Sequence, residues 1–272
     1  MPVVGTNTAA NSAIRFLNNN ANMASNSVSK LASGSRIVRA SDDAAGLAIS
    51  TKLTGDVTAL KQAATNASQA ASIMQVADGG LARVSDVLQR MKALASQSLS
   101  GTVTDTERAY INAEFTALNS EIGGIADTTT FNGSELIKAG YNQNFFVGIA
   151  TGGAVNNIAA DLSSVDASAA AVGGSVSNAS AAATAFTAVT TQISNIAEDR
   201  ATVGALISRF ETRGQQVATS IENIEAANSK LKDVDLAAEQ SKLVTANVLT
   251  QAAVSALSQA NQIPQTLLRV LQ

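Results

Sequence analysis

The chain has 272 residues, enough for one or two domains with a sizeable core, and it carries a net charge of −3 with a pI near 5.0. It contains no His, no Cys and no Trp, so the commonest general base, the commonest metal ligand and any thiol nucleophile are missing. We therefore expect a protein that is not an enzyme and holds no cofactor or metal, and the acidic balance disfavours a nucleic-acid binder.

The N-terminal stretch MPVVGTNTAANSAIRF has neither the charged n-region nor the apolar h-region of a cleavable signal peptide. No run of about 18 apolar residues occurs in the sequence, so we expect no membrane span. An export route that uses no cleaved signal is compatible with both observations.

Apolar residues recur at alternating spacings of three and four along most of the chain, which predicts long helices that pack through heptad seams. The first series, near the N-terminus, comprises Ala10, Ile14, Leu17, Ala21, Ala24, Val28 and Leu31.

A second helical series runs from Ile49 to Ala95, with a three-residue skip at Ala77 beside Gly79 and Gly80. We interpret it as one continuous helix with locally altered winding.

Between these two helices, the stretch RASDDAAGLAIS (39–50) places two adjacent carboxylates before a run of small apolar residues. Ser41 is expected to cap the second helix, with Asp42 and Asp43 in its first turn, where the helix dipole favours anions. A metal site is disfavoured, because the chain has no His and no nearby carboxylate completes an oxygen cage.

The sequence SGT (100–102) is expected to end the second helix, and TDTE (104–107) has the form of a capping box that opens a third. From about 129 the period changes: FNGSELIKAG (131–140) is a turn-rich link, and NFFVGIATGGAVNNIAADL (144–162) predicts two short strands around a Gly-Gly turn. The Ala/Ser/Gly-rich stretch 163–183 is interpreted as surface loop or frayed helix. The third helix is expected to bury Ile111, Phe115, Leu118, Ile122 and Ile125.

The longest series begins near Ala179 and ends near Leu231, interrupted at Arg200, Gly214 and Asn228. It predicts a helix of roughly 75 Å at about 1.5 Å per residue. The last series comprises Leu243, Ala246, Thr250, Ala253, Leu257, Ala260, Pro264, Leu267 and Leu271.

Both ends of the chain contain long uncharged stretches, between Arg15 and Lys30 and between Lys242 and Arg269. A surface helix of a monomer normally has a charged face, so these stretches predict surfaces that other chains bury. The alternative is that the two end helices bury each other. Their Ala, Thr and Asn seams would then offset little of the ordering entropy, roughly 1–2 kcal/mol per residue. We expect ends that are disordered in the monomer and fold on assembly.

The chain resembles bacterial flagellin in five blocks that follow the family's order. The resemblance implies a mainly α fold. Residues 1–40 and 235–272 would form an inner antiparallel coiled coil, and residues 41–234 an outer helical domain with a small β element at about 129–165. No inserted variable domain is expected. The blocks are KLASGSRIVRASDDAAGLAIS (30–50), LQRMKALASQSLSGT (88–102), FNGSELI (131–137), GALISRFE (204–211) and LAAEQSKLVTANVLTQAAVSALSQANQIPQTLLRVL (236–271).

The resemblance also implies a function and partners. The chain would be exported unfolded by the flagellar type III apparatus and would polymerise into an extracellular filament for swimming. A chaperone would bind its C-terminal segment, and filament cap and hook-junction proteins would contact it. The expected polymerisation core is Ile14, Leu17, Val28, Leu31, Leu243, Leu249, Leu257, Leu267 and Leu271. Positions matching the contact site of a Toll-like innate immune receptor, or serving contacts between subunits, are Gln89, Arg90, Leu94, Gln97 and Glu114.

Two other functions remain as alternatives. A hook–filament junction subunit would have similar termini, although the middle blocks favour the filament. A helical signalling protein like the cytoplasmic part of a chemoreceptor is also Ala-rich and heptad-patterned, but the predicted strands and the uncharged ends do not fit it.

Overall fold

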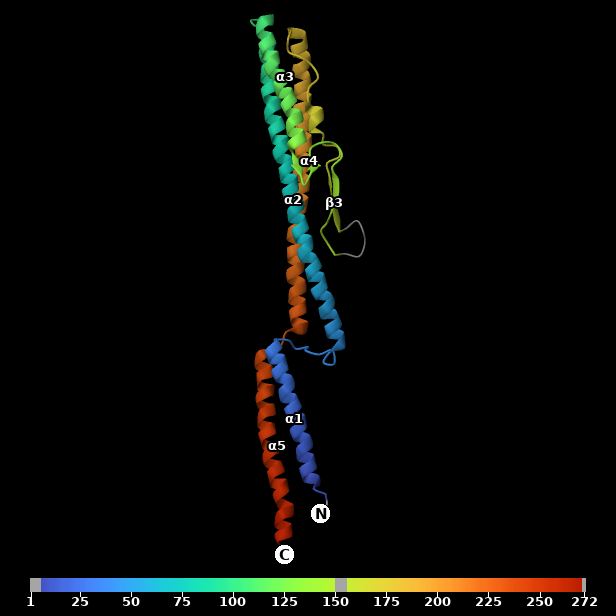
Figure 1. The fold of residues 1–272 in the computed structure, drawn as a ribbon, viewed down its shortest axis with the longest axis vertical. Coiled ribbons are helices and arrows are strands. Elements are labelled where there is room, and N and C mark those ends of the chain that lie inside the picture. The colour runs from blue at the N-terminus through green and yellow to red at the C-terminus, as the bar shows by residue number, and fades with distance from the viewer. Residues whose placement is uncertain (1–5, 150–155, 271–272) are drawn as a thin grey trace. The chain divides into compact units, whose positions relative to one another are not determined.

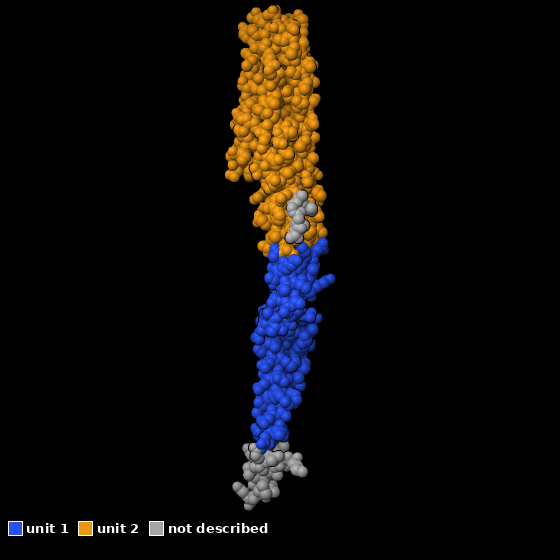
Figure 2. Space-filling view, turned by 90° about the vertical axis from the view of Figure 1, so that its right-hand side faces the viewer, with its two compact units in different colours: residues 1–55, 223–272 blue, residues 56–222 orange. Residues whose placement is uncertain are grey.

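The computed structural model describes residues 6–149 and 156–270, with side chains as far as residue 262. The chain divides into two compact units: unit 1 comprises residues 1–55 and 223–272, and unit 2 comprises residues 56–222 (Figure 2). In chain order (Figure 1) the elements are α1 (Thr8–Ser33), α2 (Ala44–Ser98), α3 (Asp105–Thr128), β1 (Thr130–Phe131), β2 (Ser134–Glu135), β3 (Asn142–Phe146), β4 (Asn157–Asp161), the short 3₁₀ helix η2 (Ala167–Ala170), α4 (Ala179–Lys232) and α5 (Leu236–Val270).

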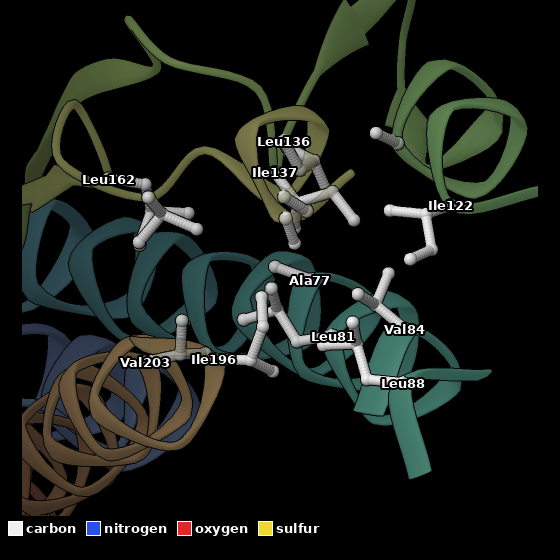
Figure 3. Close-up of a cluster of buried hydrophobic side chains, with 14 of the residues drawn as sticks. Ala77, Leu81, Val84, Leu88, Ile122, Leu136, Ile137, Leu162, Ile196 and Val203 are labelled. Atoms are coloured by element: carbon white, nitrogen blue, oxygen red, sulfur yellow. The ribbon is translucent and has the colours of Figure 1, made fainter. Parts of the chain in front are cut away.

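The mainly α fold predicted from the heptad patterns is confirmed, and α2 is continuous through Gly79 and Gly80. In unit 2 the large apolar side chains of α2, α3 and α4 point inward and close over one core (Figure 3). The fully buried ones on these helices include Met74, Leu81, Leu88, Met91, Phe115, Ile122, Ile196 and Phe210. The same core contains Leu136, Ile137, Ile158 and Leu162 from the segment between α3 and α4.

The junction between α2 and α3 is closed by polar contacts that the sequence only partly predicts. The capping box is confirmed, because Thr104 accepts from the Glu107 backbone while Glu107 accepts from that of Thr104. The buried Arg108 guanidinium donates to the Ser98 carbonyl at 2.9 Å and the Ser100 carbonyl at 3.1 Å. Arg108 therefore satisfies the Ser98 carbonyl at the end of α2 and is a second donor to the Ser100 carbonyl, which also accepts from the Val103 amide.

Two small antiparallel hairpins follow α3. The predicted pair is confirmed as β3 and β4, paired from Asn142 opposite Asp161 to Phe146 opposite Asn157, and the predicted Gly-Gly turn lies outside the described residues. The stretch 131–140 also contains a hairpin, β1–β2, which was predicted only as a turn-rich link. Its turn residues, Asn132 and Gly133, both have positive φ, the backbone that a two-residue hairpin turn requires.

The prediction that residues 163–183 form surface loop or frayed helix is wrong for the first half of that stretch. Its apolar residues are buried, and α3 holds its backbone. The side-chain oxygens of Asn119 and Asn112 accept from the backbone amides of Val172 (2.7 Å) and Val176 (2.8 Å). Small side chains that individually bury little area are thus fixed by side-chain-to-backbone hydrogen bonds. The buried residues are Val165, Ala167, Ala170, Val172 and Val176.

Each interruption of the long α4 series has a local explanation. Arg200 pairs with Asp78 of α2, with Nε to Oδ1 at 2.8 Å. Gly214 lies against Ala67, so the two helices approach closely there. Asn228 donates to the Thr54 hydroxyl at 3.3 Å.

The neighbouring glycines of α2 provide a matched test of this packing. A Cβ at Gly80 would lie 2.7 Å from the Thr129 side chain and 3.0 Å from Ile137 Cδ1, whereas a Cβ at Gly79 meets open space. We expect Gly80→Ala to lower the free energy of unfolding by about 1–3 kcal/mol through overpacking. Gly79→Ala should raise it by about 0.5–1 kcal/mol through helix propensity. Urea unfolding of both variants checks this, and equal effects would contradict the packing.

Candidate functional site

In unit 1, α1 and α5 lie side by side in antiparallel orientation (Figure 1). Near one end of the pair Asn7 Nδ2 donates to the Ala260 carbonyl at 2.8 Å, and near the other the Ser27 hydroxyl donates to Glu239 Oε1 at 2.7 Å. Because each contact joins the start of one helix to the end of the other, the two helices run in opposite directions.

The predicted seam of α5 is confirmed from Leu243 to Ala260, and the side chains of Pro264, Leu267 and Leu271 lie outside the described ones. Its buried residues are spaced by seven, and half-buried residues lie between them, so α5 packs on α1 through a regular heptad face. Most of these side chains are small, and burying an Ala methyl contributes only about 0.8 kcal/mol. In order the seam is Glu239, Leu243, Ala246, Thr250, Ala253, Leu257 and Ala260.

The predicted seam of α1 is right at every seventh residue and wrong at the positions between. The structure turns Ile14, Ala21 and Val28 to the exposed side, and the seam contains Ala13, Asn20 and Ser27 instead. Ala13 and Ser27 are smaller than Ile14 and Val28, which lets the helices approach closely, and Ser27 donates to the Glu239 carboxylate. The observed seam is Ala10, Ala13, Leu17, Asn20, Ala24, Ser27 and Leu31.

Most of the large apolar side chains of the pair therefore lie outside the seam. Phe16 and Val248 are each 58% exposed, in a pair whose fully buried apolar side chains are all alanines among those described. Leu17, Leu31, Leu243 and Leu257 of the predicted polymerisation core are half-buried at the seam, and the side chains of Leu267 and Leu271 lie outside the described ones. The exposed set is Ile14, Phe16, Met23, Val28, Leu236, Val244, Val248, Leu249 and Val254.

The two helices differ in their outer faces. The face of α1 opposite its seam carries Asn and Ser together with Arg15, so it is polar although nearly uncharged. On α5, Val244 and Val248 lie one turn apart away from the seam, and both are exposed. A helix that is apolar on several sides is normally enclosed by other helices.

One carboxylate, that of Glu239, is buried in this seam of mostly small side chains. Glu239 accepts from Lys242 Nζ at 2.9 Å and from the Ser27 hydroxyl at 2.7 Å. The hydrogen bond from Lys242 lowers the pKa of Glu239 the most, and the hydrogen bond from Ser27 lowers it further. The positive charge of Lys30 acts in the same direction.

Residues 34–43 connect α1 to α2. Backbone contacts between residues 34–36 and 232–234, which we call the clasp, join this connection to the segment before α5. Ser35 forms a β-bridge with Asp233, the Arg36 amide donates to the Lys232 carbonyl at 2.6 Å, and the Val234 amide donates to the Gly34 carbonyl at 3.1 Å. Gly34 has φ +67°, a backbone that favours glycine. The clasp therefore fixes where the α1–α5 pair begins.

The start of α2 differs from the prediction that Ser41 caps it. Asp43 immediately precedes the helix, and its carboxylate accepts from the Gly46 amide at 2.8 Å, so Asp43 is the cap. Asp42 instead accepts from the amides of Val38 and Arg39, and these backbone hydrogen bonds lower its pKa. The turn that Asp42 closes occupies residues 38–42, so the helix starts after Ser41 rather than at it.

The residues predicted to meet an innate receptor are only partly available. Gln89, Arg90, Gln97 and Glu114 are exposed, and Arg90 pairs with Glu114 through Nη2 and Oε1 at 2.6 Å. Leu94 is 2% exposed and packs in the core of unit 2, so the prediction that it shares the surface of Arg90 is wrong. The helix packs on more than one neighbour here, which buries a wider stripe than a two-helix seam.

Within the described part of the chain, no group of three or more Asp or Glu side chains is placed to hold a metal ion. No helix in that part is long and apolar enough to cross a membrane.

Comparison with known proteins agrees with this geometry. The family models for the bacterial flagellin N-terminal helical region and C-terminal helical region match residues 4–142 and 186–271. Flagellin of Halalkalibacterium halodurans is 37% identical over 274 residues, covering 99% of this chain and 100% of its own. The flagellar filament 33 kDa core protein of Treponema phagedenis is 33% identical, covering 99% of this chain and 100% of its own.

A crystal structure of Bacillus cereus flagellin matches with a TM-score of 0.50 and 26% identity, covering 60% of this chain and 94% of that one. The two family models together span most of the sequence, and relatives align over nearly its whole length. The chain therefore belongs to the bacterial flagellin family.

Proposed function

We propose that this chain is a structural subunit that polymerises into the flagellar filament, and that neighbouring copies bury the outer faces of its α1–α5 pair. The observation that carries the proposal is the packing of that pair, with mostly small side chains in the seam and most of the large apolar side chains outside it. Family membership supports the same conclusion.

The exposed apolar side chains are numerous enough to drive association. Nine large ones lie exposed on the described parts of α1 and α5. Burying what remains accessible of each contributes about 1 kcal/mol, so covering all nine contributes on the order of 10 kcal/mol per subunit. That is comparable to the estimated loss of translational and rotational freedom on association, so many neighbours must act together.

The same packing supports coupled folding and assembly. Ordering roughly sixty residues against a seam of small side chains is poorly compensated within one copy. We infer that residues 1–40 and 235–272 form an inner domain that is disordered in the monomer and folds in the filament, while residues 41–234 form an outer domain that is folded beforehand. Disordered ends also suit export through the type III apparatus without a cleaved signal.

The proposal extends to the partners of the subunit. Copies would associate heterologously, so that one surface of a copy contacts a different surface of its neighbour. Such contacts generate an open helical tube rather than a closed ring. A chaperone would cover the apolar α5 before export, and the filament cap and hook-junction proteins would meet the same end helices. The surface for a Toll-like receptor would comprise Gln89, Arg90, Gln97 and Glu114, with Leu94 supporting the helix from inside.

Deleting residues 243–272 tests the role of the end helices. We expect a soluble, largely helical monomer, because the core of unit 2 contains none of the deleted residues. This monomer should fail to extend preformed filament seeds in electron micrographs, while the full chain extends them. Normal filaments from the truncated chain would refute the proposal.

Limited proteolysis of the full-length monomer tests whether the ends are disordered before assembly. We expect early cleavage in the terminal forty or so residues at each end, with residues 50–230 spared for much longer. In filaments the same bonds should be protected. Ends that resist cleavage equally well in the monomer would show that the pair is already folded there.

Acid should weaken the assembled pair through Glu239. Because its pKa is lowered in the folded pair, its stabilising contribution is complete above the ordinary Glu pKa and is lost as pH falls through the lowered value. We expect Glu239→Gln filaments to be less stable than wild type at pH 7 and to show a smaller loss between pH 5 and 3. Thermal dissociation followed by light scattering checks this, and parallel pH profiles would contradict it.

A further inference from the structure

Unit 2 is acidic as a whole but contains one groove whose charge is positive. Residues 56–222 contain nine Lys and Arg against fifteen Asp and Glu, a net charge of −6. A groove of about 340 Å³ between α4 and β4 is nevertheless lined by Arg209 and Arg213, and no Asp or Glu lines it among the residues that the structure describes. We call it the arginine groove.

One face of α4 and the β3–β4 hairpin form the arginine groove. Phe145 of β3 packs edge to face on Phe210 of α4, with ring centroids 5.7 Å apart, so the hairpin lies along the helix there (Figure 1). Ile158 of β4 lines the groove on the hairpin side. The lining residues of α4 lie between Ala205 and Gln216 at spacings of one, three and four, which places them on one side of the helix.

The two Arg side chains lie one helical turn apart and differ from most cations of the unit. In the described part of the chain, at least five Lys and Arg of unit 2 pair with a carboxylate, whereas Arg209 has no ion-pair or hydrogen-bond partner there. Arg213 Nη1 donates at 3.0 Å to Gln216 Oε1, a neutral acceptor, which leaves the Gln216 amide nitrogen as a further donor. Like charges at this spacing oppose each other, so an anion between them would relieve that repulsion.

The hydroxyl groups of the groove are also uncommitted. In the described stretch of α4 from Thr184 to Ser220, eight of the ten Ser and Thr side chains donate to the carbonyl oxygen four residues earlier. The two that do not are Ser208 and Thr212, and both line the groove. Their hydroxyl hydrogens therefore remain free to donate to a bound ligand.

We propose that the arginine groove binds a small anion that carries a phosphate group. A phosphate monoester has a charge of about −1.5 to −2 at pH 7, which matches two Arg side chains. The planar guanidinium group donates two parallel hydrogen bonds to phosphate oxygens, and the Ser208 and Thr212 hydroxyls donate to the remaining ones. The groove volume lies within the range of small-molecule sites, and Ile158 and Ala205 supply apolar contacts for an organic substituent.

Titration of the full-length monomer, followed by ³¹P NMR of the ligand at constant ionic strength, tests the inference. The probes are inorganic phosphate and glucose 6-phosphate, and we expect saturable binding of one phosphate group per chain. Arg209→Gln should weaken binding at least tenfold. Arg83→Gln, which removes the same charge from a side chain that is 79% exposed and lies outside the groove, should change it by less than twofold.

The two probes distinguish the source of the phosphate group. Tighter binding of glucose 6-phosphate would assign the groove to a phosphate ester, and equal binding would assign it to the free ion. Absence of saturable binding of either probe, or equal weakening by the two Arg substitutions, would overturn the site. The inference concerns the monomer, so either result leaves the proposed role in the filament unchanged.

A second pair of variants tests the hydroxyl donors without changing charge. Thr212→Ala removes a hydroxyl from the groove, whereas Thr219→Ala removes one that is bonded to the Gln215 carbonyl. Both variants should keep the wild-type helical signal in circular dichroism. We expect Thr212→Ala to bind the phosphate probes at least threefold more weakly than Thr219→Ala, and identical affinities would contradict the groove as their binding site.

Discussion

The constraint on which unit 1 depends is the size of the side chains between α1 and α5. Two helices that meet mostly through Ala, Ser and Thr, with four half-buried Leu side chains between them, approach closely but bury little apolar area, and most of their larger side chains remain on the outside. Such a pair is incomplete by itself. The clasp at residues 34–36 and 232–234 and the Ser27–Glu239 hydrogen bond determine where the helices pair, but they add little area. Only further helices around the pair supply it.

Unit 2 solves the same packing problem in the opposite way. Its three helices turn Met, Leu, Ile and Phe side chains inward, and the β3–β4 hairpin, Leu136, Ile137 and the 163–176 segment cover the core. Large side chains that are fully buried contribute roughly 1.5–3 kcal/mol each, which offsets the entropy of ordering a unit of this size. The chain therefore combines a unit that completes its own core with one that requires neighbours, a combination suited to a subunit that must stay soluble until it is added to a polymer.

Heptad spacing predicted the long helices and the α5 seam because apolar periodicity reports which face of a helix is buried. It failed on α1, where Ile14 and Val28 are more apolar than Ala13 and Ser27 but lie outside the seam. The position of Ser27 depends on Glu239, more than two hundred residues away, and spacing within one helix does not contain that contact. The burial of residues 163–176 escaped prediction for a related reason. Asn112 and Asn119 hold that segment, and its Ala/Ser composition alone is typical of a loop. Asp43 replaced Ser41 as a cap because Asp42 closes a turn that the capping rule does not consider.

Burial also changes how the conspicuous residues of a family motif are interpreted. Arg90 and Leu94 are one helical turn apart, so spacing alone places them together on the surface. In the fold the first pairs with Glu114 in solvent while the second supports α2 from the core.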